Sequence, residues 1–226
     1  MATHYKKTFP LYINSIFDVI AIGGILCELS HTRQFAHMVV TTDPNHKGLS
    51  EWALRGVVNG EQARGIVVDG AYFLSGILLG NNHGAPEYFE YTLPCTFISK
   101  TPPFHPAEVV NSVGVTGYGT IIEVFTVAKS DHETSICLSV EHCNFNRDTN
   151  EYISFLVRFM GSTPDIDQSL LTACTPGKEI LITGSIVDRD LSQNTWLVKM
   201  NYLALVGDEH RDHHQETEDG LKNSTL

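Results

Sequence analysis

The sequence predicts an all-β chain made of two similar units, and three observations lead to that prediction. Short runs rich in β-branched and aromatic residues, several of them alternating apolar with polar, recur along most of the 226 residues. A paired run at 177–207 has a weaker echo around residue 76. A stretch at 101–108 with three prolines separates the two copies, because proline disfavours both helix interiors and central strands.

The segment 177–207 is predicted to form a β-hairpin. Residues 179–187 and 196–206 are rich in strand-forming residues, and the polar segment 188–194 between them supplies the turn. A hairpin carries no chemistry by itself, so this segment indicates architecture before it indicates function.

The echo is centred on two glycines. Placing Gly184 on Gly76 aligns the two hairpins without a gap, and it places Trp196 on Tyr88, since each aromatic follows its glycine at the same spacing (196 − 184 and 88 − 76). A second echo relates residues 24–29 to residues 119–124. Two echoes in the same order indicate an internal duplication.

The two echoes have different offsets, 184 − 76 for the first and 119 − 24 for the second, so the later copy is expected to hold 13 extra residues between them. Residues 162–171 offer a place for these residues. They contain a Ser/Thr cap, an early proline, acidic residues and then leucines, which is a helix-start pattern. We therefore expect a short helix there.

The other predicted strands follow in chain order. One run, 51–58, could also start a short helix, and analogy with the second copy favours a strand. In the run 152–160, Tyr152 and Arg158 share one face, while Phe155 and Val157 share the other. The predicted strands are 16–29, 34–41, 51–58, 64–79 and 88–98 in the first copy, and 112–127, 136–140 and 152–160 in the second.

These strands divide the chain into five parts. Residues 1–15 are expected to be an N-terminal arm that docks on a partner or on the first unit, or else a partly ordered tail. The first unit is 16–100, the linker 101–108 and the second unit 109–207. The polar, acidic and histidine-rich tail 208–226 is predicted to be disordered.

Composition excludes several classes of protein. The net charge is −11 and none of the three main parts is basic, which argues against coating duplex DNA by charge alone. Five scattered cysteines fit neither a zinc site nor a disulfide scaffold, so we expect buried thiols and no metal or other cofactor. Neither a membrane-spanning segment nor a secretory signal is recognisable, which predicts an intracellular protein of the nucleus or cytoplasm.

Catalytic patterns are absent from the sequence. Acid and base residues occur at 131–133 and 141–142, but no serine or cysteine lies in a nucleophile motif. Gly114, Gly117 and Gly119 lack the GK[ST] ending of a phosphate loop, and a bent strand explains them better. We therefore predict that the protein is not an enzyme.

The strand order of the second copy resembles the OB-fold, a five-stranded Greek-key barrel. The features shared with that fold are a long first strand bent at glycines, a helix between strands three and four, and a fourth strand opening Pro-Gly-Lys-Glu-Ile-Leu-Ile-Thr-Gly at residue 176. The first copy resembles an OB barrel whose helix is short or missing. Together they are similar to the tandem OB modules of replication protein A and telomere end-binding proteins.

This resemblance implies binding of single-stranded DNA, or less readily RNA, across strands two and three, through stacking on aromatics and a few cations. Each candidate also has a structural explanation, since tryptophans usually pack in cores and surface cations are usually just solvated. Glu141 on the same face counts against the site. The candidates are Phe35, His37, Trp52 and Arg55 in the first copy, and Arg147, Tyr152, Arg158, Trp196 and Lys199 in the second.

The negative charge of both halves favours an alternative function. On this hypothesis the OB units contact protein subunits of a larger complex and bind no nucleic acid directly.

Overall fold

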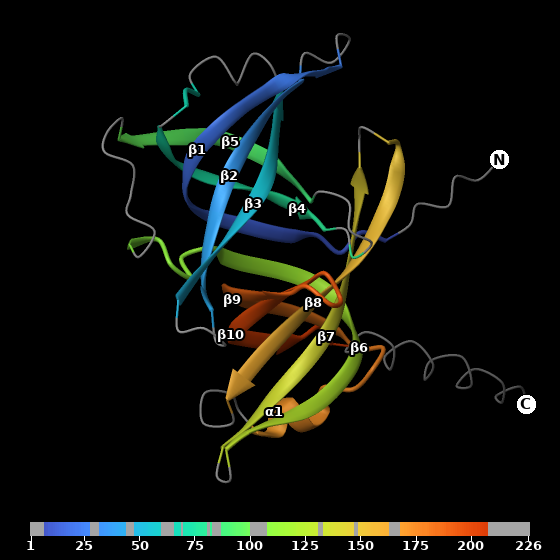
Figure 1. Cartoon of the computed structure of the whole chain (residues 1–226). Helices are drawn as coiled ribbons and strands as arrows, with labels where there is room; N and C mark the ends of the chain where they lie inside the picture. The colour runs from blue at the N-terminus through green and yellow to red at the C-terminus, as the bar shows by residue number, and fades with distance from the viewer. Residues whose placement is uncertain are drawn as a thin grey trace, which may run out of the picture.

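The structure, a computed structural model, describes residues 7–27, 32–43, 48–59, 66–68, 70–80, 82, 87–99, 108–130, 133–146, 149–162 and 168–207. Within them the chain forms ten strands and one short helix (Figure 1). The mostly-β prediction is confirmed. In chain order the elements are β1 (Leu11–Cys27), β2 (Thr32–Asp43), β3 (Gly48–Asn59), β4 (Ala71–Leu79), β5 (Tyr88–Ser99), β6 (Gly114–Ser130), β7 (Glu133–Asn146), β8 (Glu151–Ser162), α1 (Gln168–Ala173), β9 (Glu179–Asp190) and β10 (Thr195–Leu205).

The observed boundaries refine the predicted ones. The run 51–58 is strand, as favoured, and lies within β3. β1 begins at Leu11 and so includes the last five residues of the predicted arm 1–15. β4 begins at Ala71 rather than 64, because residues 66–68 are not part of a strand. The tail 208–226 and residues 101–107 of the linker lie outside the described residues.

Strand pairing closes a five-stranded barrel. β1 pairs with β2 and β4, β2 pairs with β3, and the parallel pair β3–β5 together with the antiparallel pair β4–β5 completes the circuit. The pairings β6–β7, β7–β8, β8–β10, β10–β9 and β9–β6 follow the same order, again with one parallel pair. This order is that of an OB-like Greek-key barrel.

The two circuits share one continuous sheet, because their first strands pair with each other. Residues 11–14 of β1 run antiparallel to residues 114–117 of β6, and in Figure 1 the start of β1 lies beside β6 at the middle of the molecule. Ile13 and Val115 on these strands are both buried. The same side of the shared sheet therefore faces the core in both halves.

The two halves are also joined through Asn82, which follows β4. Its side-chain oxygen accepts a hydrogen bond from the Leu156 backbone N–H at 2.6 Å, and its amide nitrogen donates to the backbone oxygens of Leu156 and Asn194 at 3.2 and 3.1 Å. Next to it, the ring of Phe155 fills the space in front of Gly80. The β4–β5 connection of the first half is thus docked on β8 of the second.

Gly76 and Gly184 have the same environment, as their echo suggests. A Cβ on Gly76 would lie 2.1 Å from the carbonyl oxygen of Glu90, and a Cβ on Gly184 would lie 2.3 Å from that of Lys199. In each hairpin the following strand passes too close for any side chain. The glycine at this point is therefore a requirement of the strand pairing.

The register corrects the rest of the first echo. Gly76 pairs with Tyr91 and Gly184 pairs with Met200, so the offset between the closing strands (200 − 91) is one position larger than the offset between the glycines (184 − 76). Trp196 therefore corresponds to position 87 and not to Tyr88. A difference of one position matters in a strand, because successive side chains point to opposite faces.

The second echo is wrong by a larger amount. Ile13 and Val115 pair with the two equivalent glycines, so the offset between β1 and β6 is 115 − 13 and not the 119 − 24 of the echo. Most of the additional length of the later half lies between β8 and β9, where residues 163–178 replace the shorter connection 60–70. That is five residues more (16 − 11), in the connection that contains α1.

Candidate functional site

The predicted ligand face is the outer side of β7 and β8. On β8 the side chains of Phe155, Val157 and Phe159 are buried, whereas Tyr152 and Leu156 are 36% and 37% exposed. The inner and outer faces of this strand are therefore those predicted from its alternation.

Arg158 lies on this outer face and is held by the turn between β9 and β10. Its Nη1 atom lies 2.9 Å from Oδ2 of Asp190, its Nη2 donates to Gln193, and its guanidinium lies 5.7 Å from the ring centroid of Phe125. The hydrogen bond from the Ser192 side chain is the largest of the effects that hold the pKa of Asp190 below its usual range, and the Ser192 backbone N–H adds to it. A phosphate that approached Arg158 would have to compete with the Asp190 carboxylate.

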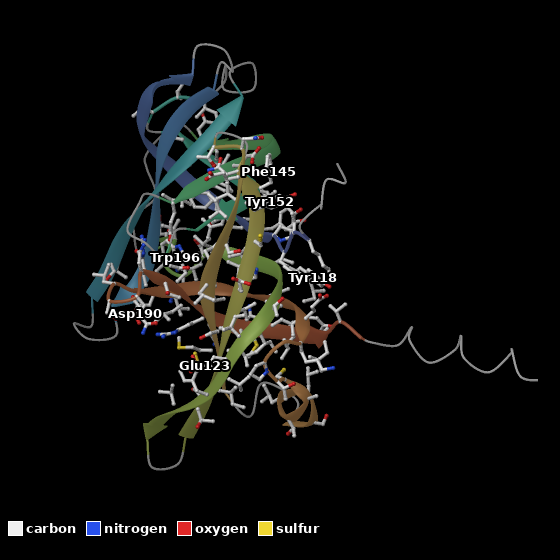
Figure 2. The ribbon with its side chains drawn as sticks, turned by 90° about the vertical axis from the view of Figure 1, so that its right-hand side faces the viewer. Tyr118, Glu123, Phe145, Tyr152, Asp190 and Trp196 are labelled. Carbon is white, nitrogen blue, oxygen red and sulfur yellow. The ribbon has the colours of Figure 1, made fainter. Side chains whose placement is uncertain are left out.

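Two acidic residues lie on the same face as Arg158. By register, Glu123 on β6 is opposite Ser139 on β7, which is opposite Arg158, and Glu141 is opposite Leu156. Figure 2 shows Glu123 and Asp190 on the second half, on β6 and at the end of β9. The face therefore has mixed charge, which disfavours binding an anion by electrostatics alone.

An aromatic pair lies at the far end of β7 and β8. Tyr152 and Phe145 are opposite each other in register, and their rings meet edge to face with centroids 5.2 Å apart (Figure 2). Sequence reasoning identified Tyr152 and missed Phe145. The signal was available, because the two residues are equally spaced in sequence from the predicted turn between these strands. Arg147 lies outside the described residues.

Trp196 is not on the surface, which corrects its place among the stacking candidates. It is 2% exposed, its Nε1–H donates to Glu87 Oε2 at 2.6 Å, and the Arg189 guanidinium lies 4.9 Å from its ring centroid. Nη2 of Arg189 also lies 3.4 Å from the Glu87 carboxylate. Burial raises the pKa of Glu87 to about 7, against the opposing effects of Arg189 and Trp196.

Lys199 is exposed on β10, where it is opposite Met160 of β8. Neighbours in register share a face of the sheet, so the outer face of β7 and β8 continues onto β10 at this lysine. Arg158 is opposite Leu197, two residues before Lys199 on β10, so Arg158 and Lys199 are close neighbours on this face.

The first-half candidates lie on β2 and β3, and the structure describes only their backbone. Arg55 pairs with Tyr88 as Arg158 pairs with Leu197, so the two arginines hold matching positions. Phe35, His37 and Trp52 hold, in the same order, the register positions of three residues that are buried in the second half: Leu138, Val140 and Phe155.

Gly117 and Gly119 make room for a buried histidine, and with Gly114 they lie within strand β6, as the bent-strand explanation of these glycines expects. A Cβ on Gly117 would lie 2.6 Å from Cε1 of His142, and one on Gly119 would lie 3.1 Å from it. Nδ1 of His142 is 3.0 Å from the Tyr118 carbonyl oxygen, and burial lowers the pKa of His142 to about 4. His142 is therefore neutral at physiological pH.

Residues 7–10, the described part of the predicted arm that precedes β1, contact the second half, and not the first half as considered above. Phe9 exchanges two backbone hydrogen bonds with Cys143 of β7, and its ring stacks on Tyr118 at a centroid distance of 5.3 Å. Lys7 lies over both rings and is paired with Glu179 at 2.6 Å.

The described residues were considered for metal-binding clusters and for a reactive thiol. They contain no group of three histidine, cysteine or acidic side chains placed to hold a metal ion. Cys137, on the outer side of β7, is buried, and burial raises the pKa of its thiol to about 11, so it is not a nucleophilic thiolate at neutral pH. Within the same residues, no helix has the length and apolar character needed to cross a membrane.

Comparison with known proteins yields a likeness of structure. A deletion mutant of the single-stranded DNA binding protein from Thermus aquaticus has a TM-score of 0.53 at 10% sequence identity, and the match covers 92% of this chain and 98% of that chain. The chain has an OB-like fold. The wild-type Thermus aquaticus protein matches with a TM-score of 0.49 at 10% identity, covering 89% of this chain and 93% of the other. No protein-family model and no curated protein matches the sequence.

Proposed function

We propose that the chain binds single-stranded nucleic acid, DNA in preference to RNA, through two OB barrels in tandem, and that it is not an enzyme. Replication protein A and telomere end-binding proteins, whose tandem OB modules this sequence resembles, have this arrangement. We expect it to act inside the cell, in the nucleus or cytoplasm.

The tandem arrangement is supported by two features. The strand circuits β1–β5 and β6–β10 follow one order, with matching glycines at 76 and 184. The likeness to the Thermus aquaticus protein covers 92% of this chain, so it is not confined to one half. That protein is a single-stranded DNA binding protein, and we extend its ligand to this chain as part of the proposal.

The observation that carries the proposed ligand is the outer face of β7 and β8. It presents Tyr152 beside Phe145 for base stacking, Leu156 as a further apolar contact, and Arg158 and Lys199 as cations. An exposed tyrosine packed against a half-buried phenylalanine on this face of an OB barrel fits sequence-tolerant binding, because every base offers a ring face.

A second function is favoured by the charge of this same face. Arg158 is already paired with Asp190, Glu123 and Glu141 lie on the same face, and the chain carries a net charge of −11. These facts suit an OB module that contacts protein subunits of a larger complex.

A salt series of fluorescence anisotropy with labelled single-stranded oligonucleotides separates the two functions. Nucleic-acid binding predicts a dissociation constant of about 1 μM or lower at low salt. The affinity should fall as the salt concentration rises, because lysine and arginine side chains that contact phosphates displace the salt cations bound there. The matched RNA and duplex oligonucleotides serve as controls for the preference. Absence of binding to any single strand at low salt would favour the protein-interaction function.

A further inference from the structure

Residues 7–10, which precede β1 and are here called the docked segment, lie between β6 and β7 just past the end of the pairing of these two strands. On one side, Phe9 and Cys143 of β7 exchange two backbone hydrogen bonds, of 2.6 and 3.0 Å. On the other side, the backbone N–H of Tyr118 on β6 donates to the Pro10 carbonyl oxygen at 3.1 Å. The docked segment therefore continues the sheet between β6 and β7.

The side chain of Phe9 lies on the ligand face proposed above. Cys143 is on the outer side of β7, because its partner on β8, Ser154, shares a face with Tyr152. Directly paired residues of antiparallel strands have their side chains on the same face, so Phe9 shares the outer face with Cys143 and Ser154. The pair of Tyr152 and Phe145 is the next on that face, roughly 7 Å further along the strands.

Phe9 and Tyr118 form a stacked pair on this face. Their ring centroids are 5.3 Å apart and their planes are inclined by 27°. Nζ of Lys7 lies 5.1 Å from the centroid of Phe9 and 5.6 Å from that of Tyr118. The Glu179 carboxylate is paired with Lys7 and also accepts a hydrogen bond from the Tyr118 hydroxyl, so the two rings and the cation are held in one arrangement. Figure 2 shows Tyr118 on β6, below Phe145 and Tyr152.

This arrangement offers more than is needed to fill the space between two strands. Backbone hydrogen bonds alone close that space, and residues without a ring or a charge would supply them equally well. The docked segment adds a ring and a cation on the outer side, where Phe9 and Tyr118 are half-buried and the Lys7 side chain is 60% exposed. Rings that are already held in place lose little freedom when a base stacks on them.

The charges nearby indicate that stacking contributes more to this position than electrostatic attraction does. Glu179 is paired with Lys7, and Glu141 lies on the outer side of β7, two residues before Cys143. An exposed ion pair is weak, so a phosphate can compete for Lys7, but the gain from that exchange is small. A base bound to the rings does not meet this competition.

We propose that the Phe9–Tyr118 pair is a second stacking position for the single strand that binds at Tyr152, and that Lys7 contacts a phosphate of that strand. The proposal rests on the proposed nucleic-acid function and adds the docked segment to its site. The strand then runs from β8 across β7 toward β6, and not along β7 toward the acidic residues around Arg158.

Fluorescence anisotropy of the full chain with a labelled single strand of about 16 nucleotides tests the second position. Phe9→Leu and Tyr118→Leu keep an apolar side chain but remove the ring, and each should weaken binding by about fivefold or more, the low end for one stacked base. Thr8→Ala, at the exposed position between Lys7 and Phe9, is the matched control and should bind as wild type does.

Photocrosslinking provides a readout that a merely structural role would not produce. Oligonucleotides carrying iodouracil at each position in turn are irradiated with the wild-type protein, and mass spectrometry of the digested protein locates the crosslinks. We expect crosslinks at Phe9 or Tyr118 as well as at Tyr152. If the melting temperatures of the leucine variants fall together with their affinities, the crosslinks of the wild type decide between stacking and support of the fold.

The failures of the two proposals are distinguishable. A wild type that binds, with both leucine variants binding as tightly as Thr8→Ala, overturns the second position and leaves the proposed function intact. Crosslinks at Tyr152 without any at Phe9 or Tyr118 have the same meaning. A wild type that binds no single strand at low salt overturns both the function and the second position.

Discussion

The indole N–H of Trp196 donates a hydrogen bond of 2.6 Å to the carboxylate of Glu87, which lies far earlier in the chain. Both residues are buried where the β4–β5 connection of the first half meets the β9–β10 hairpin of the second. The contact makes Trp196 part of the junction between halves.

Trp196→Phe should therefore lower stability and leave nucleic-acid affinity unchanged. The substitution removes one of the partners of a buried carboxylate, a loss of about 1–3 kcal/mol. Urea denaturation gives the free energy of unfolding, and anisotropy gives the affinity. A large loss of affinity in a variant of near-normal stability would return Trp196 to the ligand site.

Glu87 should make stability depend on pH. Its pKa is raised from 4.5 to about 7 on folding, so the native state binds more protons than the unfolded state between these values. Its contribution is fully present below pH 4.5 and is lost as pH rises through about 7, by up to about 3 kcal/mol in all.

Glu87→Gln removes that titration and should flatten the decline in unfolding free energy between pH 4.5 and 7, relative to wild type. The comparison with wild type matters, because buried His142, whose pKa is lowered, contributes a rise over part of the same range. Urea denaturation at several pH values provides the curves. Identical pH dependence in the two proteins would contradict a buried, raised Glu87.

Gly184→Ala should destabilise the second half. The added methyl group would lie 2.3 Å from the Lys199 carbonyl oxygen, so β9 and β10 must separate, at a cost of about 1–3 kcal/mol or more. Ser185→Ala, at the next position, adds no atom and serves as the control in the same urea titration. Equal stability of the two variants would mean that the hairpin absorbs the clash.

Asp190→Asn tests the state of Arg158. The asparagine oxygen can still accept the hydrogen bonds from Ser192, so the turn is kept while the charge opposite Arg158 is removed. If Arg158 binds phosphate, affinity for single-stranded DNA should rise by a few fold and its salt dependence should steepen.

The double variant Asp190→Asn, Arg158→Gln should lose that gain. A fall in affinity in Asp190→Asn equal to the fall in Arg158→Gln alone would indicate that Arg158 acts by holding the turn in place. Fluorescence anisotropy at two salt concentrations gives the affinity for single-stranded DNA of the two single variants and the double variant.

Local sequence patterns predicted the features that depend on neighbouring residues, namely the faces of a strand and the glycines where two strands approach closely. Alternation in 152–160 separated buried Phe155 from exposed Tyr152 correctly, because a strand with one buried face must alternate. The glycines at 76 and 184 were found because only glycine fits a position where the next strand passes so close.

The rest depended on contacts between distant segments. The pairing of Arg158 with Asp190 and the burial of Trp196 against Glu87 join segments that no spacing rule connects. The echoes misplaced Trp196 because a bulge between Leu197 and Val198 shifts the register of the closing strand. Sequence similarity between the two copies therefore leaves the matching residue uncertain by one position wherever one copy contains a bulge.

The affinity of Tyr152→Ala for single-stranded DNA tests most directly whether the outer face of β7 and β8 is the ligand site. We predict a loss of about 1–3 kcal/mol of binding free energy, the value of one stacked base, with the melting temperature nearly unchanged. Ile122→Ala, at an exposed position of β6, is the control and should bind as wild type does. Equal affinities of Tyr152→Ala, Ile122→Ala and wild type would contradict the proposed site.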